Sequence, residues 1–129
     1  MAKKTYKIGA YELDWWARVE IDFDKTFEMG NEVISTEMAI KMMVEFWSGW
    51  QWKLKDNHND YTLLFLKNLT AEIIGEIAEN NYNLQGVLSH FRNAEGWCRM
   101  DGSAGITILD VDEFRWSDNF DFDVEEVEG

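Results

Sequence analysis

Two segments of the chain alternate an apolar residue with a carboxylate at every position. They are residues 19–24, with the sequence VEIDFD, and residues 120–125, with the sequence FDFDVE. A period of two residues is typical of a β-strand with one buried face, because successive side chains of a strand point to opposite sides. Each segment therefore holds three carboxylates in a row, about 6.5–7 Å apart. The chain is expected to build a sheet with one apolar and one acidic face.

Between the two acidic segments the residue pattern changes to helical spacing. A first helix is expected from residue 35 or 36 to about residue 47, with Ser35 or Thr36 as its N-cap. A second helix is expected over residues 61–79 and a short third one over residues 83–91. The first helix carries an i, i+4 apolar stripe made of Met38, Met42 and Phe46 together with Ala39, Met43 and Trp47.

Loops and strands complete the predicted order. Gly30 and Asn31 mark one loop, and residues 56–60 form another. Residues 4–8 are expected to form a short edge strand. Residues 15–24 form the first strong strand. Residues 106–111 and 120–127 follow the helices as further strands, and the short connection between these two predicts an antiparallel hairpin.

The order of strands, then helices, then strands favours an α+β fold. We expect a mostly antiparallel sheet of about four strands with two or three helices packed on one face. With 129 residues, 46% of them hydrophobic, and no proline, the chain is expected to fold as one compact domain over residues 1–129.

Charge is the second constraint on function. The formal net charge is −13, and residues 101–129 hold ten carboxylates against Arg115 alone, a net charge of −9. Nucleic acids and anionic lipids repel such a surface, so we expect neither direct nucleic-acid binding nor membrane binding. The expected partner is a basic surface, of the kind found on proteins that hold DNA. The lone Cys98 and the absence of a long apolar run favour the cytoplasm.

Residues that could carry catalysis or bind a metal form no recognisable pattern. Cys98 could act as a nucleophile with His58 or His90, but none of the three lies in a known local signature. Residues 56–67 begin like a calcium loop, yet Tyr61 stands where such a loop needs glycine. We therefore predict no enzyme activity, no metal site and no cofactor.

The acidic rows predict a binding function. Their charge spacing is of the same order as that of backbone phosphates, so a rigid acidic sheet face could mimic DNA. A solvated sheet face without function is the alternative interpretation. The mimic would consist of Glu20, Asp22, Asp24, Asp110, Asp112, Asp121, Asp123 and Glu125. A different hypothesis is a non-catalytic accessory protein that binds a protein partner through the exposed aromatic residues Trp50, Trp52 and Trp116.

Three short motifs support a family resemblance. FWSG at residues 46–49 ends a predicted helix, EGW stands at residues 95–97, and ITI at residues 106–108 begins a strand. With this layout, the chain resembles a small phage and prophage family of unknown function over most of its length. The first nine residues, MAKKTYKIG, resemble the N-terminus of a Neisseria anti-CRISPR family that inhibits type II-C RNA-guided nucleases, with Lys3 as a departure.

The two resemblances together imply a phage-encoded inhibitor of host defence that acts in the bacterial cytoplasm. The acidic sheet face then suggests how it would act. An RNA-guided nuclease reads the motif beside its target through Arg and Lys in a groove, and an acidic decoy could occupy that groove.

Overall fold

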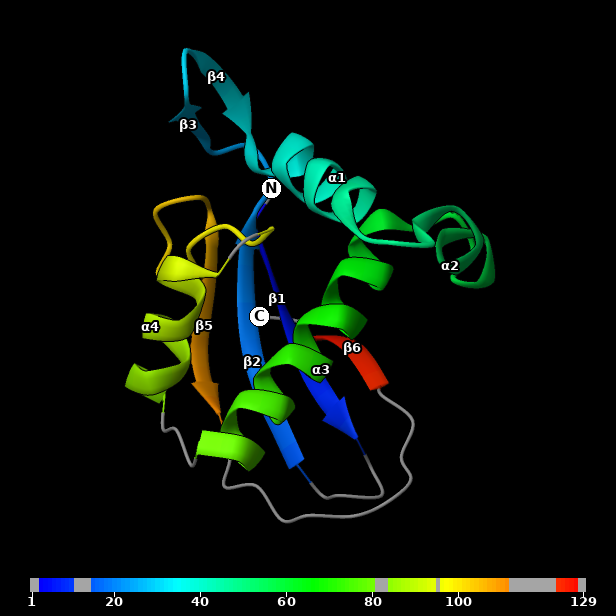
Figure 1. Ribbon diagram of the computed structural model, residues 1–129, viewed down its shortest axis with the longest axis vertical. Coiled ribbons are helices and arrows are strands. Elements are labelled where there is room, and N and C mark those ends of the chain that lie inside the picture. The colour runs from blue at the N-terminus through cyan, green and yellow to red at the C-terminus, as the bar shows by residue number, and fades with distance from the viewer. Residues whose placement is uncertain (1–2, 11–14, 81–83, 95, 112–122, 128–129) are drawn as a thin grey trace.

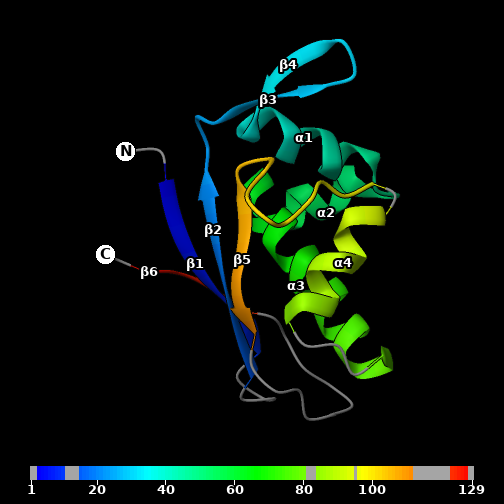
Figure 2. The same cartoon turned by 90° about the vertical axis from the view of Figure 1, so that its left-hand side faces the viewer.

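The structure, a computed structural model, describes residues 3–10, 15–80, 84–94, 96–111 and 123–127. The α+β fold expected from the sequence is confirmed. Four antiparallel strands form one sheet in the order β5-β2-β1-β6, and the helices cover one of its faces (Figures 1 and 2). The strands of this sheet are β1 (Lys3–Ala10), β2 (Trp15–Asp22), β5 (Ile106–Val111) and β6 (Asp123–Val127).

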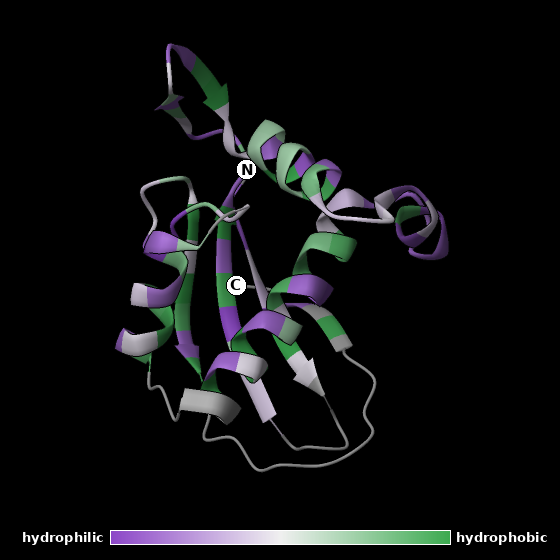
Figure 3. Ribbon diagram, in the orientation of Figure 1, coloured by the Kyte–Doolittle hydropathy of each residue, from purple (hydrophilic) through white to green (hydrophobic). Residues whose placement is uncertain are grey.

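Strand β2 is built as its alternation predicts. Trp15, Ala17, Val19 and Ile21 are fully buried and face the helices, whereas the residues between them lie on the other face. Figure 3 shows this alternation of apolar and polar residues along β2. Side chains from the neighbouring strands and the helices complete one apolar core, which includes Ile8, Ile106, Phe65, Leu69 and Phe91. The strand ends at Asp22, so Asp24 lies in the following turn and not in the predicted strand.

Two predictions about strand order are wrong. Strand β1 is central, because it pairs with β2 along one side and with β6 along the other. Strands β5 and β6 lie at opposite edges of the sheet and form no hairpin. Residues 112–122, which connect β5 to β6, can span up to about 36 Å, whereas the three strand spacings between these strands amount to only about 14 Å. The connection is therefore long enough to cross the sheet, and its length does not require the two strands to be neighbours.

The predicted helices are present, and the structure adds a fourth. They are α1 (Thr36–Phe46), α3 (Tyr61–Asn80) and α4 (Leu84–Asn93), with α2 (Trp50–Asp56) added between the first two. Ser35 caps α1 by accepting a hydrogen bond from the backbone N–H of Met38 at 3.2 Å. Asp60 likewise accepts one from Leu63 in the first turn of α3, at 3.0 Å.

The sequence did not predict the small hairpin that precedes α1. Strands β3 (Thr26–Met29) and β4 (Glu32–Ser35) pair on either side of the expected loop at Gly30, which adopts a φ of +64°. Most of their residues are exposed, so neither strand has the apolar alternation that would have revealed it. The hairpin extends beyond the N-terminal end of α1 (Figure 1).

Candidate functional site

The sheet face opposite the helices is the surface that the sequence marked as acidic. In Figure 2 it lies on the side of β1 and β2 away from the helices. The register places Lys3 beside Asp22, Thr5 beside Glu20 and Lys7 beside Arg18. Because paired residues of neighbouring strands share a face, basic residues of β1 and β2 stand among the predicted acidic row.

Basic side chains on this face contact carboxylates or an aromatic ring. The Arg18 guanidinium binds Asp110 Oδ2 through Nη2 at 2.8 Å and through Nε at 3.0 Å. Lys3 Nζ lies 3.7 Å from Glu20 Oε1. Lys7 Nζ lies 4.2 Å from the ring centroid of Trp16, a cation–π contact. The described part of this face is therefore a mosaic of charges and not a uniform acidic plate.

The predicted mimic residues are only partly brought together. Glu20, Asp22 and Asp110 share the open sheet face. Asp24 is exposed in the turn beyond it. The register pairs Asp123 of β6 with Gly9, and Glu125 with Lys7. Asp112, Asp121 and Trp116 lie outside the described residues.

One half of the predicted apolar stripe forms an exposed surface on the outer side of α1. We call Met38, Met42 and Phe46 the α1 stripe; each is exposed, by between 45% and 61%. Buried Ala39, Ile40, Met43 and Val44 form the core side of the helix instead. The predicted i, i+4 stripe thus divides into a core half and an exposed half. The sequence alone could not separate them, because both halves have the same helical period.

The aromatic residues after α1 have separate environments. Trp50 is partly buried against the core, with its ring centroid 6.5 Å from that of Tyr61. Trp52 is 61% exposed on α2. Trp47 packs inward, 5.0 Å from the ring of Trp97. Phe46 lines a depression of about 520 Å³ beside this aromatic pair, and polar residues, among them Asn68 and Glu72 of α3, line the rest of it.

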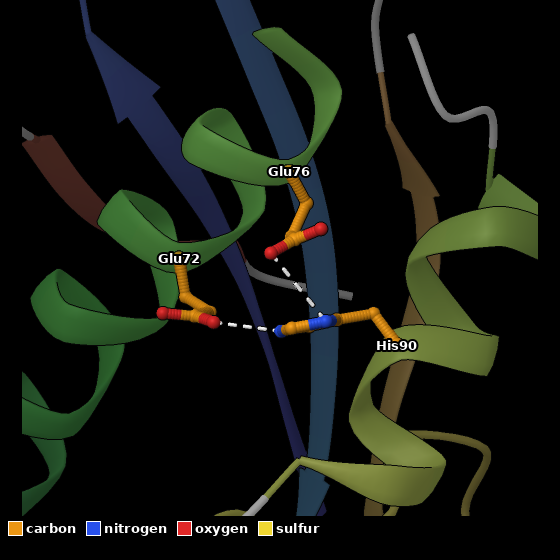
Figure 4. Close-up of side chains that lie close together, drawn as sticks. All are labelled: Glu72, Glu76 and His90. Carbon is orange, nitrogen blue, oxygen red and sulfur yellow. Dashed lines mark hydrogen bonds and ion pairs between the residues drawn. The ribbon is translucent and has the colours of Figure 1, made fainter. Parts of the chain in front are cut away.

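A cluster of two glutamates and one histidine joins α3 to α4. Glu72 and Glu76 lie one turn apart on α3, and His90 of α4 lies between them (Figure 4). His90 Nε2 is 2.6 Å from Glu72 Oε2, and Nδ1 is 3.4 Å from Glu76 Oε1. No local pattern in the sequence pairs His90 with a charged residue. The i, i+4 spacing of the two glutamates was the available signal, but their histidine partner comes from another helix.

The sequence contains Cys98 and His90 as candidates for a catalytic pair. Both ring nitrogens of His90 face glutamates, not the thiol of Cys98. Burial raises the pKa of the Cys98 thiol, and the thiolate is the reactive form. Burial therefore lowers the fraction of Cys98 that is present as thiolate.

Comparison with known proteins identifies the family. Residues 18–126 match a family described as a protein of unknown function, DUF2528. The chain belongs to the DUF2528 family. This DUF2528 protein is 29% identical over 106 residues to protein ea10 of Escherichia phage lambda and to a lambda prophage-derived protein ea10 of Escherichia coli O6:H1. Each match covers 78% of this chain and 80% of the relative. No solved structure matches the chain.

The match agrees with the expected phage and prophage family of unknown function. It begins at residue 18, so the resemblance of the first nine residues to an anti-CRISPR family lies outside it. Among the described residues, every helix is too short or too polar to span a lipid bilayer.

Proposed function

We propose that this DUF2528 protein is a phage protein that acts in the bacterial cytoplasm by binding a protein partner through the α1 stripe. The observation that carries the proposal is the exposure of Met38, Met42 and Phe46 on successive turns of one helix. Apolar residues scattered singly over a surface need no explanation, whereas a row of three on one helix face is typical of a helix that docks into a groove.

Charge around the stripe indicates the chemistry of the partner. Glu37 and Glu45 are exposed on α1 near the stripe, and Glu28 and Glu32 are exposed on the preceding hairpin. Lys41 is the exposed base of the same helix. The partner we propose has an apolar groove bordered by basic side chains, which agrees with the net charge of −13.

The double variant Met38→Gln, Met42→Gln tests the proposal, because exposed side chains can change with little effect on folding. A photo-crosslinker at position 42, in cells that carry the phage, would capture the partner. Its affinity for wild-type protein and for variants is then measured with purified components. We expect the double variant to bind at least about tenfold more weakly, which corresponds to about 1.4 kcal/mol.

Leu109→Gln is the matched control, because Leu109 is exposed to a similar degree on β5, away from α1. This control should bind like the wild type. Equal affinity of the double variant and the wild type would refute docking through the α1 stripe.

A second candidate function is the DNA-mimicking inhibitor of an RNA-guided nuclease. The excess of carboxylates and the shared face of Glu20, Asp22 and Asp110 favour it. The ion pairs of Glu20 with Lys3 and of Asp110 with Arg18 reduce the bare negative charge of that face. This mosaic is the reason that we rank mimicry second.

Titration of the protein into DNA binding by a guide-loaded type II-C nuclease, at low and high salt, tests mimicry. A mimic should block DNA binding, and less so as salt rises, since salt screens exposed charges. The variant Asp22→Lys, Asp24→Lys should lose this inhibition. Asp56→Lys, a single charge reversal at the exposed end of α2, should retain it. Unaltered DNA binding in the presence of the wild-type protein would exclude inhibition of that nuclease by this route.

A further inference from the structure

The cluster of Glu72, Glu76 and His90 has the composition and spacing of a metal-binding site. Its side chains are between 19% and 34% exposed, so they lie at the border of the core and remain accessible to ions. One ligand atom from each residue can be chosen so that all three lie within 4.8 Å of one another. Two helices supply them, and Figure 4 shows the carboxylates on α3 turned toward the imidazole on α4.

The spacing of these atoms is close to what a small divalent ion requires. Zn²⁺ binds histidine nitrogen and carboxylate oxygen at about 2.0–2.2 Å in tetrahedral geometry. Ligand atoms of such a site are therefore about 3.3–3.5 Å apart. The ligand atoms of the cluster, one from each residue, lie within 4.8 Å of one another, with Glu72 beside Nε2 at 2.6 Å and Glu76 beside Nδ1 at 3.4 Å. Because an ion binds only one ring nitrogen, zinc binding requires one carboxylate to turn from its present nitrogen toward the other.

Charge also favours a cation at this cluster. Two carboxylates and one imidazole converge there in a partly buried place. A divalent cation bound to the neutral ring and both carboxylates would balance both charges.

Space beside the cluster leaves room for a further ligand. A depression of about 400 Å³ is lined by His90 with Ser89, Asn93 and Ala94. On the α3 side, Glu72 lines the depression of about 520 Å³ that also contains Asn68. A water molecule could therefore reach the fourth position of a tetrahedral ion. The same openings give an ion a path from solvent.

From this geometry we propose that Glu72, Glu76 and His90 bind Zn²⁺, with water as the fourth ligand, and that the ion ties α4 to α3. One nitrogen and two oxygen ligands suit zinc better than Ca²⁺ or Mg²⁺, which prefer oxygen alone. Phe46 of the α1 stripe and Glu72 line the same depression, but no residue of the stripe is a proposed ligand, so the zinc site does not depend on the proposed function. An ion that binds only the folded state stabilises that state.

Isothermal titration of ZnCl₂ into metal-free protein tests the site, together with thermal unfolding with and without zinc. We expect one zinc per chain and a higher unfolding temperature. In His90→Gln the affinity should fall by more than about 100-fold, because loss of even an outer-shell partner costs 10- to 100-fold. Glu72→Gln should act in the same direction.

The chain contains a matched control, since its other histidine, His58, is exposed in the loop after α2. His58→Gln should bind zinc like the wild type. Far-UV circular dichroism would show whether His90→Gln is folded, and ligand-field absorption of Co²⁺-loaded wild-type protein would report nitrogen and oxygen ligands independently of any variant. Absence of zinc binding, equal binding by folded His90→Gln, or Co²⁺ spectra typical of the hydrated ion would overturn the proposal.

Discussion

Among single residues, Gly105 occupies a tightly constrained position. Its φ is +84°, and its carbonyl oxygen accepts the backbone N–H of Asp22 at 2.8 Å, at the end of β2. Beside it, the buried hydroxyl of Thr36 donates to Ala104 O at 2.8 Å. A Cβ atom at Gly105 would overlap this hydroxyl and would lie 3.0 Å from Asp22 O. One glycine thus allows β2, α1 and the start of β5 to meet.

Gly105→Ala should therefore destabilise the protein by about 2–5 kcal/mol, the sum of about 1–2 kcal/mol for a left-handed backbone and about 1–3 kcal/mol for overpacking. Gly30→Ala is the matched comparison, because Gly30 also has a positive φ but a Cβ atom there meets nothing within 4 Å. That variant should lose only the backbone part. Urea unfolding of both variants measures the difference, and equal losses would show that the contact with Thr36 is unimportant.

At the scale of elements, α1 performs two tasks with its two sides. Ile40 and Val44 are buried against the core, whereas the α1 stripe faces outward. The helix starts at Ser35, where the strand β4 ends, so the cap also fixes the junction between the hairpin and the helix. The stability of α1 and partner binding by the α1 stripe can therefore be tested with separate variants.

Ser35→Ala should lower the free energy of unfolding by about 1 kcal/mol, because the backbone N–H of Met38 loses its capping acceptor. Ser89→Ala, at an exposed position inside α4, should change it by no more than about 0.5 kcal/mol. Chemical denaturation gives both values. Partner binding through the α1 stripe should persist in Ser35→Ala below its unfolding transition, whereas a stability loss no larger than that of Ser89→Ala would mean that the cap is dispensable.

The sequence predicted α1, α3 and α4, but it predicted neither α2 nor the order of the strands. Ser35 and Asp60 cap their helices through residues three positions away, so local sequence contains the necessary information. Helix α2 was missed because only Leu54 among its residues is buried, which leaves no apolar periodicity to detect. The position of β1 was missed because a strand does not specify its neighbours; these are chosen by pairing with distant segments.

At the scale of the whole molecule, charge repulsion opposes compactness. The net charge is −13, while the ion pairs among the described residues include Arg18 with Asp110, Lys3 with Glu20 and Lys4 with Glu126. All three pairs are substantially exposed, and exposed pairs contribute little to stability. Repulsion between the remaining carboxylates should therefore dominate the electrostatic part of the folding free energy.

Raising the ionic strength from low to physiological and above should consequently stabilise the fold, since salt screens the repulsion. The measurement is the urea midpoint at several NaCl concentrations. Arg18→Gln raises the net negative charge by one and should steepen the rise. A midpoint that falls with salt would mean that the ion pairs outweigh the repulsion.

The α+β class, the buried face of β2 and the helices α1, α3 and α4 could be predicted from the sequence, because each follows from residues close together in the chain. Which charges meet, in contrast, depends on contacts between segments far apart in the chain. Arg18 and Asp110 are 92 residues apart, and His90 reaches Glu72 from another helix. Tertiary packing also decided which half of the α1 apolar residues faces water. Periodicity defines the faces of a helix or strand, but the partner of each face depends on how the whole chain closes on itself.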